Sequence, residues 1–204
     1  MGRDLRAELD SIGRLPDGVR KTAALAAWFQ GLFPAGTQVP VLVGGAAAEI
    51  YSGGAYLSGD LDFVGEVPPE VVRLLEDAGF SRQGRHWVHE QAQVFIEMPG
   101  ARLEPPEQAV LARTGDCEVV ALSPEDVLVD RLAAWQFWRS PVDGAAAFWI
   151  WRNLGVGMDL ARLEAAARRR EVQTALAALR EFFGELGSRD PGAEEVTAWA
   201  RTIF

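Results

Sequence analysis

The sequence lacks the features of a secreted, membrane-anchored or disulfide-bonded protein. Cys117 is the only cysteine among 204 residues, so no intrachain disulfide can form, and a reducing compartment fits this chain. Residues 1–15 alternate in charge and have no apolar run of the kind that a signal peptide needs. No apolar stretch reaches the length of a transmembrane helix. We therefore expect a cytoplasmic protein with no membrane partner.

An excess of positive charge is also missing, since the formal net charge is -9 at pH 7. A broadly acidic surface disfavours unspecific binding to DNA or to an anionic membrane, although it leaves room for a local basic patch. The basic run Arg168-Arg169-Arg170 is interpreted first as the solvated end of a helix, where positive charge suits the helix dipole. A contact with RNA or DNA is the second interpretation.

Histidine is scarce: the chain has two, His86 and His89, three residues apart in a segment with a strand pattern. Side chains three apart in a strand point to opposite faces, so this pair makes a poor chelate for a metal ion. We expect surface positions or packing between strands for both.

Apolar residues and large aromatic side chains are abundant. Hydrophobic residues make up 49% of the chain, an ordinary value for a globular protein. At 204 residues the chain is long enough to bury a sizeable core. Four tryptophans recur at helical spacing, and we expect them in the core or in the wall of a cleft: Trp135, Trp138, Trp149 and Trp151.

The order of apolar patterns predicts an α+β fold. We expect strands at 39–43, 61–64, 86–89, 94–98 and 118–122, and helices at 3–12, 19–33, 46–51, 70–78, 123–138, 143–154, 160–170, 172–186 and 194–203. The stretch 102–114, which contains two adjacent prolines, indicates a loop. Strands thus cluster early and helices fill the rest. We expect an α+β domain at 1–122 with N-terminal helices, and a helical region at 123–204 packed on it.

Two aspartates, Asp60 and Asp62, introduce the expected strand at 61–64. In an extended segment their side chains point to the same face and repel each other. A divalent cation is the obvious group to offset that repulsion. The flanking residues are apolar, which indicates a buried strand whose polar tip is more often functional than an exposed edge. Taken alone, the pair is equally compatible with a solvated turn.

A third carboxylate, Glu97, lies in the apolar run 94–98. If this strand pairs beside 61–64, Glu97 can join Asp60 and Asp62. Three carboxylates can hold two magnesium ions, and such sites drive in-line phosphoryl transfer. The local pattern equally allows Glu97 to meet water or an arginine at a strand end.

Gly44 and Gly45 separate the expected strand at 39–43 from a short helix. Glycine allows close backbone approach, and the N–H groups at a helix N-terminus can bind phosphate. The spacing matches neither a Walker loop nor a G-x-G-x-x-G fingerprint. The alternative is tight packing of the helix against the strand.

The order of these motifs resembles that of the nucleotidyltransferase superfamily related to polymerase beta. The pair Gly44-Gly45, a short helix, the segment Ser58-Gly59-Asp60-Leu61-Asp62 and an acid on a later strand follow its pattern. The closer similarity is to AbiEii-type nucleotidyltransferase-like proteins, which include toxins of type IV toxin–antitoxin systems. Residues 123–134, S-P-E-D-V-L-V-D-R-L-A-A, are similar to their second motif. Asp143 follows twelve residues after Arg131, as in that motif.

The resemblance implies a nucleotidyltransferase-like mixed sheet with flanking helices, followed by a C-terminal helical part. It implies transfer of a nucleoside monophosphate from an NTP to an acceptor hydroxyl, with Mg²⁺ as cofactor. The nucleotide, and a protein antitoxin or an RNA acceptor, are the implied partners. The implied residues are Asp60, Asp62 and Glu97 for metal and catalysis, Arg131 and Asp143 for catalysis, and Gly44, Gly45, Ser58 and Arg131 for the nucleotide.

Three positions depart from the family's pattern. Arg131 stands where the family has Lys, so a phosphate contact survives but the side chain cannot serve as a tunable base. Tyr56 and Leu57 occupy the place of the arginine usual before the aspartates, and Glu97 replaces the commoner Asp. These departures favour an alternative: a catalytically inactive nucleotidyltransferase-fold protein that acts by binding, for example as a toxin–antitoxin component.

Overall fold

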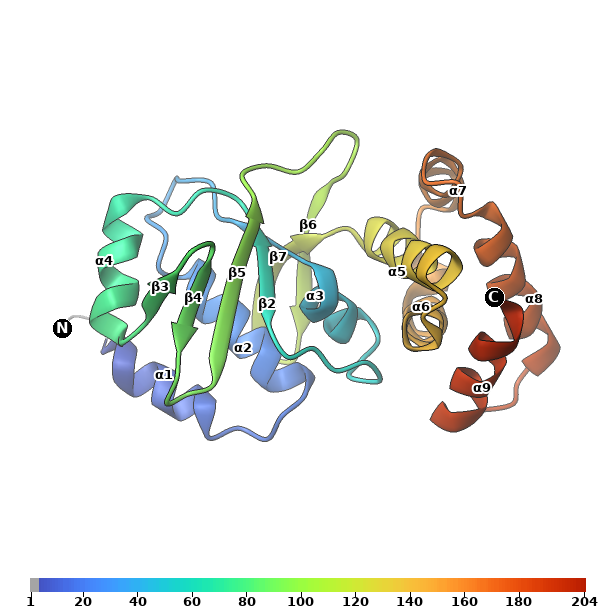
Figure 1. The fold of residues 1–204 in the computed structure, drawn as a ribbon, viewed down its shortest axis with the longest axis horizontal. Helices are drawn as coiled ribbons and strands as arrows, with labels where there is room; N and C mark the ends of the chain where they lie inside the picture. The colour runs from blue at the N-terminus through green and yellow to red at the C-terminus, as the bar shows by residue number, and fades with distance from the viewer. Residues whose placement is uncertain (1–3) are drawn as a thin grey trace. The chain divides into compact units, whose positions relative to one another are not determined.

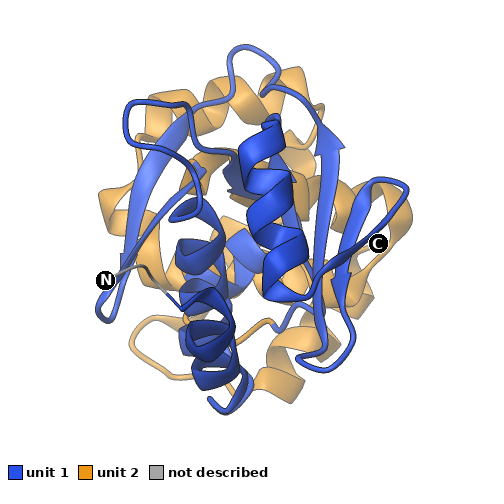
Figure 2. Cartoon of the chain, turned by 90° about the vertical axis from the view of Figure 1, so that its left-hand side faces the viewer, with its two compact units in different colours: residues 1–50, 57–122 blue, residues 51–56, 123–204 orange. Residues whose placement is uncertain are grey.

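The structure is a computed structural model, and it describes residues 4–204. The fold is α+β, with a seven-stranded mixed sheet, flanking helices and a wholly helical C-terminal part (Figure 1). The chain divides into two compact units (Figure 2). The sheet unit comprises Met1–Ile50 and Leu57–Leu122, and the helical unit comprises Tyr51–Tyr56 and Ser123–Phe204. The short segment Tyr51–Tyr56 therefore belongs with the C-terminal helices, not with its neighbours in the sequence.

The first part of the chain supplies all the strands that the described residues form. Its elements are α1 (Leu5–Gly13), α2 (Val19–Gln30), β1 (Val41–Val43), α3 (Gly44–Tyr51), β2 (Leu61–Val64), α4 (Pro69–Ala78), β3 (Ser81–Gln83), β4 (His86–His89), β5 (Val94–Gly100), β6 (Ala109–Thr114) and β7 (Cys117–Leu122). The later elements are α5 (Pro124–Trp138), α6 (Pro141–Leu154), a 3-10 turn (Gly155–Gly157), α7 (Leu160–Arg169), α8 (Gln173–Leu186) and α9 (Ala193–Ile203). No helix among residues 4–204 combines the length and the apolar character needed to cross a bilayer.

The strands lie in the order β3-β4-β5-β2-β1-β7-β6, so β2 is at the centre of the sheet. β2 runs parallel to β5 and antiparallel to β1, and β1 runs parallel to β7. Along β2, Leu61 and Phe63 are buried while Asp62 and Val64 are half-buried. This alternation places Asp62 on the face opposite to the side chains of Leu61 and Phe63.

Helix α2 covers the face that Phe63 occupies. The rings of Phe29 and Phe63 pack with their centroids 4.7 Å apart. The buried side chain of Gln30 donates hydrogen bonds to the carbonyl oxygens of Pro40 and Val120, at 2.8 and 2.7 Å, and accepts one from the Val120 N–H at 2.9 Å. These bonds fix the end of α2 to the backbone around β1 and β7, which leaves the opposite face of β2 for polar side chains.

The helical unit has an aromatic core of its own. Trp135 is fully buried, and its ring N–H donates to the carbonyl oxygen of Ala200 at 2.8 Å. Phe182 and Trp199 stack with centroids 4.3 Å apart. A Cβ at Gly144 would come within 2.8 Å of both the Trp135 ring and the Ala200 side chain. Glycine at this position therefore allows α5, α6 and α9 to approach closely.

Three sequence predictions differ from the structure. The stretch 109–114 was expected in a loop, but it forms β6 and pairs antiparallel with β7. The strand β3 was not predicted, because Ser81–Gln83 is exposed throughout and carries no apolar alternation. Trp138 was expected in the core or in the wall of a cleft, but 82% of its surface is exposed, because α5 ends at this residue beyond the packed core.

Candidate functional site

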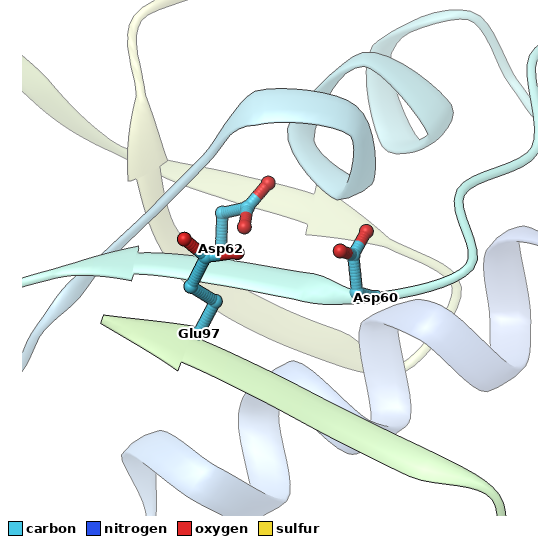
Figure 3. A group of neighbouring side chains, drawn as sticks. All are labelled: Asp60, Asp62 and Glu97. Atoms are coloured by element: carbon cyan, nitrogen blue, oxygen red, sulfur yellow. The ribbon is translucent and has the colours of Figure 1, made fainter. Parts of the chain in front are cut away.

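The pairing of β2 with β5 brings three carboxylates together. Asp62 and Glu97 are direct partners in this parallel register, and Asp60 immediately precedes β2. Each of the three side chains offers one oxygen, and these oxygens lie within 4.8 Å of one another. Figure 3 shows the three carboxylates rising from the same side of their strands. The expectation that the strand of Glu97 pairs beside that of Asp62 agrees with this register.

The chemistry of the three carboxylates suits a hard cation. Asp60 is exposed, whereas Asp62 and Glu97 are half-buried, so their mutual repulsion is only partly screened by water. All three ligands are oxygens, the type that Mg²⁺ and Ca²⁺ prefer. Histidine and cysteine, the ligands typical of zinc, do not belong to this group of oxygen ligands. The donor set therefore fits a magnesium-type ion.

Gly44 lies directly against the Asp62 carboxylate. Its φ is +62°, a conformation that side chains disfavour, and a Cβ there would overlap the carboxylate of Asp62. Gly44 and Gly45 are the first two residues of α3, and the preceding Val43 is the partner of Asp62 in the sheet. The N-terminal end of α3 thus lies beside Asp62, where the helix dipole favours negative charge. Close approach is the role that the structure gives to Gly44.

Ser58 orients Asp60. Its hydroxyl donates to the Asp60 carbonyl oxygen at 3.0 Å and lies 3.4 Å from a carboxylate oxygen of the same residue. Its backbone N–H donates to the carboxylate of Glu49 at 3.0 Å. Glu49 is 1% exposed, and burial raises its pKa, although hydrogen bonds from Ser58 and Thr22 lower it. Sequence reasoning missed Glu49, and the available signal was a single acid inside an apolar helix.

Glu97 has a second set of partners. Its Oε1 forms an ion pair with Arg85 Nη2 at 2.7 Å, and its Oε2 lies 3.8 Å from His86 Nδ1. His86 is the partner of Glu97 across β4 and β5. Both alternatives left open by the sequence thus hold, because Glu97 joins the two aspartates and also meets an arginine. Arg85 and a metal ion would compete for the same carboxylate.

The two histidines lie in different surroundings. The ring of His89 is buried against Phe80, with centroids 5.1 Å apart, and its Nδ1 accepts a hydrogen bond from the Ala92 N–H at 3.0 Å. His86, by contrast, is part-exposed beside Glu97. The two rings therefore have different neighbours, Phe80 for His89 and Glu97 for His86.

Arg131 and Asp143 form an ion pair in the helical unit. Arg131 Nη1 of α5 lies 2.7 Å from Asp143 Oδ1 of α6, and both side chains are less than one-fifth exposed. The backbone N–H of Asp143 donates to Ser140 Oγ at 3.4 Å, at the start of α6. Arg131 Nε is buried and has no hydrogen-bond partner within the described residues. The twelve-residue spacing therefore corresponds to a bridge between consecutive helices, whereas the three carboxylates belong to the sheet unit.

The S-P-E-D segment fixes the start of α5 to the start of α7. Ser123 caps α5 through the backbone N–H of Asp126. Asp126 is 6% exposed and pairs with Arg162, while Glu125, 7% exposed, accepts a hydrogen bond from the Asp159 N–H at 2.8 Å. These contacts give the acids of the motif a structural function.

Comparison with models of known protein families, with curated proteins and with solved structures finds no match to this chain.

Proposed function

We propose that the chain is a Mg²⁺-dependent nucleotidyltransferase that moves a nucleoside monophosphate from an NTP to an acceptor hydroxyl. The observation that carries this proposal is the convergence of Asp60, Asp62 and Glu97 on adjacent central strands, with one oxygen of each within 4.8 Å of the others. The choice of nucleotidyl transfer as the reaction comes from the motif order, which resembles that of polymerase beta-like nucleotidyltransferases.

The three carboxylates would hold the metal. When bound, Mg²⁺ offsets the charge of a triphosphate and of the transition state for phosphoryl transfer. In the proposed reaction the acceptor oxygen forms a bond to the α-phosphorus. The bond from that phosphorus to the β-phosphate breaks, pyrophosphate leaves, and the acceptor's proton passes to a carboxylate of the site.

The neighbouring residues would position these groups. Ser58 holds Asp60 through its hydroxyl, and the start of α3 at Gly44 and Gly45 offers backbone N–H groups beside Asp62. Arg85 is 64% exposed and already contacts Glu97, so its guanidinium is a candidate phosphate ligand. Arg85 would then replace the arginine that the resembled family has just before the two aspartates. Arg131, in the helical unit, is already paired with Asp143.

Calorimetric titration with each of the four NTPs, with and without Mg²⁺, tests the proposal. We expect Mg²⁺-dependent binding of at least one NTP, and its loss in the double variant Asp60→Asn/Asp62→Asn. Asp116→Asn is the matched control, because Asp116 is an exposed acid in the turn between β6 and β7. Absence of NTP binding, or equal binding by the double variant, would refute the proposal.

A second candidate is a nucleotidyltransferase-fold protein without activity, acting in the cytoplasm by binding a protein partner such as an antitoxin. Two contacts favour it: Arg85 pairs with Glu97 of the candidate metal site, and Arg131 pairs with Asp143. Incubation with labelled NTP and total RNA separates the candidates. Transfer of label to RNA supports a toxin-like enzyme, whereas nucleotide binding without turnover supports the inactive form.

A further inference from the structure

Three large apolar side chains face solvent where α5 ends and α6 begins. Phe137, Trp138 and Val142 expose 54%, 82% and 56% of their surfaces. Trp135, one helical turn before Trp138, is fully buried, so the exposed side chains lie just beyond a well-packed core. Neighbouring apolar side chains of this size on a protein surface indicate an interaction site.

Three consecutive arginines lie at the junction of α7 and α8, which the last turn of α5 contacts. The side chain of Gln136 donates to the Glu171 carbonyl oxygen at 2.9 Å and accepts from the Ala175 N–H at 3.2 Å. These bonds hold the last turn of α5 against the junction of α7 and α8. Arg168, Arg169 and Arg170 immediately precede Glu171 at that junction, and all three are exposed.

One ion pair of α5 supports the same placement. Arg170 lies 3.2 Å from Asp130, and Asp130 precedes Phe137 by two helical turns on the same helix face. Arg139, also exposed, follows Trp138 directly. Helix α8 begins after the arginines without an acid in its first turn, so its dipole adds positive potential. We call the set Phe137, Trp138, Arg139, Val142, Arg168 and Arg169 the arginine-rimmed patch.

We propose that the arginine-rimmed patch docks an acidic segment of a partner protein, with apolar side chains set between its Asp and Glu residues. An apolar centre with a charged rim is the usual anatomy of a protein interface, and Trp and Arg dominate the binding energy of such interfaces. The patch is cationic in a chain whose net charge is -9, so complementary charge selects an acidic partner. This inference is independent of the candidate metal site.

A nucleic-acid strand fits the patch less well. Val142 offers no ring on which a base could stack, although it is one of the three apolar side chains at the centre. A long polyanion would also extend beyond the patch over the acidic remainder of the chain. Its phosphates would be repelled there by any carboxylate within the screening length of about 10 Å. A short acidic segment confined to the patch avoids that repulsion.

Fluorescence anisotropy with a labelled helical peptide tests the proposal on the full chain. The peptide has roughly fourteen residues, with Leu at the i, i+3, i+4 and i+7 positions and Glu elsewhere. A peptide with Lys in place of every Glu and an oligouridylate of similar length are the comparison probes. We expect the acidic peptide to bind with a dissociation constant below roughly 1 mM. We expect neither comparison probe to bind as tightly, and the affinity to fall with added salt.

Two variants locate the binding. Trp138→Ser and the double variant Arg168→Glu/Arg169→Glu should each weaken the acidic peptide's binding about tenfold or more. Leu111→Ser and Arg20→Glu/Arg73→Glu change exposed residues of the same types in the sheet unit and should leave it unchanged. No binding, tighter binding of the oligouridylate, or equal losses in the matched variants would each overturn the proposal.

Discussion

The buried carboxylate of Glu49 accepts a hydrogen bond from the backbone N–H of Ser58, 3.0 Å away. The Ser58 hydroxyl in turn donates a hydrogen bond to the carbonyl oxygen of Asp60. Glu49 lies in α3 and is 1% exposed, so an acid outside the candidate metal site secures the loop that presents Asp60. The geometry of the exposed carboxylate therefore depends on a residue that solvent does not reach.

Replacing Glu49 should loosen this arrangement. In Glu49→Ala the Ser58 N–H loses its buried acceptor, so we expect the free energy of unfolding to fall by about 1–3 kcal/mol. Mn²⁺, used as a probe for Mg²⁺, should bind more weakly because Asp60 is less well held. Urea unfolding and calorimetry measure the two effects. Glu49→Gln keeps an acceptor oxygen and should retain the affinity for Mn²⁺. Unchanged Mn²⁺ affinity in the alanine variant would show that Asp60 does not depend on Glu49.

The same residue predicts a pH dependence of stability. Burial raises the pKa of Glu49 above its ordinary value of 4.5. The folded state then holds the proton more tightly than the unfolded state. Protonated Glu49 therefore contributes to the free energy of unfolding in full below pH 4.5, and this contribution is lost as the pH rises through the raised pKa. Glu49→Gln cannot ionise. Between about pH 4 and pH 7, the free energy of unfolding of the wild type should therefore fall relative to that of the variant as the pH rises. A constant difference across this range would contradict the assignment.

Removal of Arg85 should strengthen metal binding. The Arg85 guanidinium lies 2.7 Å from Glu97 and is 64% exposed, so its pairing with the carboxylate is worth at most about 1 kcal/mol. Arg85→Ala should therefore raise the affinity for Mn²⁺ about two- to fivefold in a calorimetric titration. Arg113→Ala, which breaks the exposed pair with Glu118 on β6 and β7, is the matched control. If NTP binding falls while Mn²⁺ binding rises, Arg85 contacts the phosphates.

Gly44 should tolerate no side chain. Its φ of +62° disfavours alanine, and a Cβ would overlap the Asp62 carboxylate. We expect Gly44→Ala to lower the unfolding free energy by about 1–3 kcal/mol and to weaken Mn²⁺ binding, because Asp62 must move. Gly13→Ala is the control, since a Cβ there meets open space at the end of α1. Wild-type affinity in Gly44→Ala would mean that Asp62 is not a ligand.

Local patterns were sufficient to predict the elements that carry the candidate site. The apolar runs around Asp62 and Glu97 predicted β2 and most of β5, because a buried strand needs apolar neighbours on both sides of its polar residue. The left-handed cap at Gly79 and the side-chain cap at Ser123 followed from the preferences of helix ends. The α+β class followed from the order of these elements.

Other features depend on contacts that no local pattern contains. Arg85 meets Glu97 only because β4 and β5 form an antiparallel pair, and nothing in its own neighbourhood marks it. The exposure of Trp138 depends on where α5 ends relative to its core, whereas the helical spacing of the tryptophans suggested burial. β6 is a strand because β7 supplies its hydrogen bonds. In each case a partner distant in sequence decides the outcome.

The membership of Tyr51–Tyr56 in the helical unit has a practical consequence for dissecting the protein. The chain passes between the two units at three peptide bonds, after Ile50, Tyr56 and Leu122. A fragment that starts at Ser123 lacks a segment of its own unit, including the Tyr51 carbonyl oxygen that accepts a hydrogen bond from Asn153. A fragment that ends at Leu122 carries that segment without the helices that hold it. Cloning boundaries at residue 122 would therefore yield two incomplete pieces, and functional work should use the intact polypeptide.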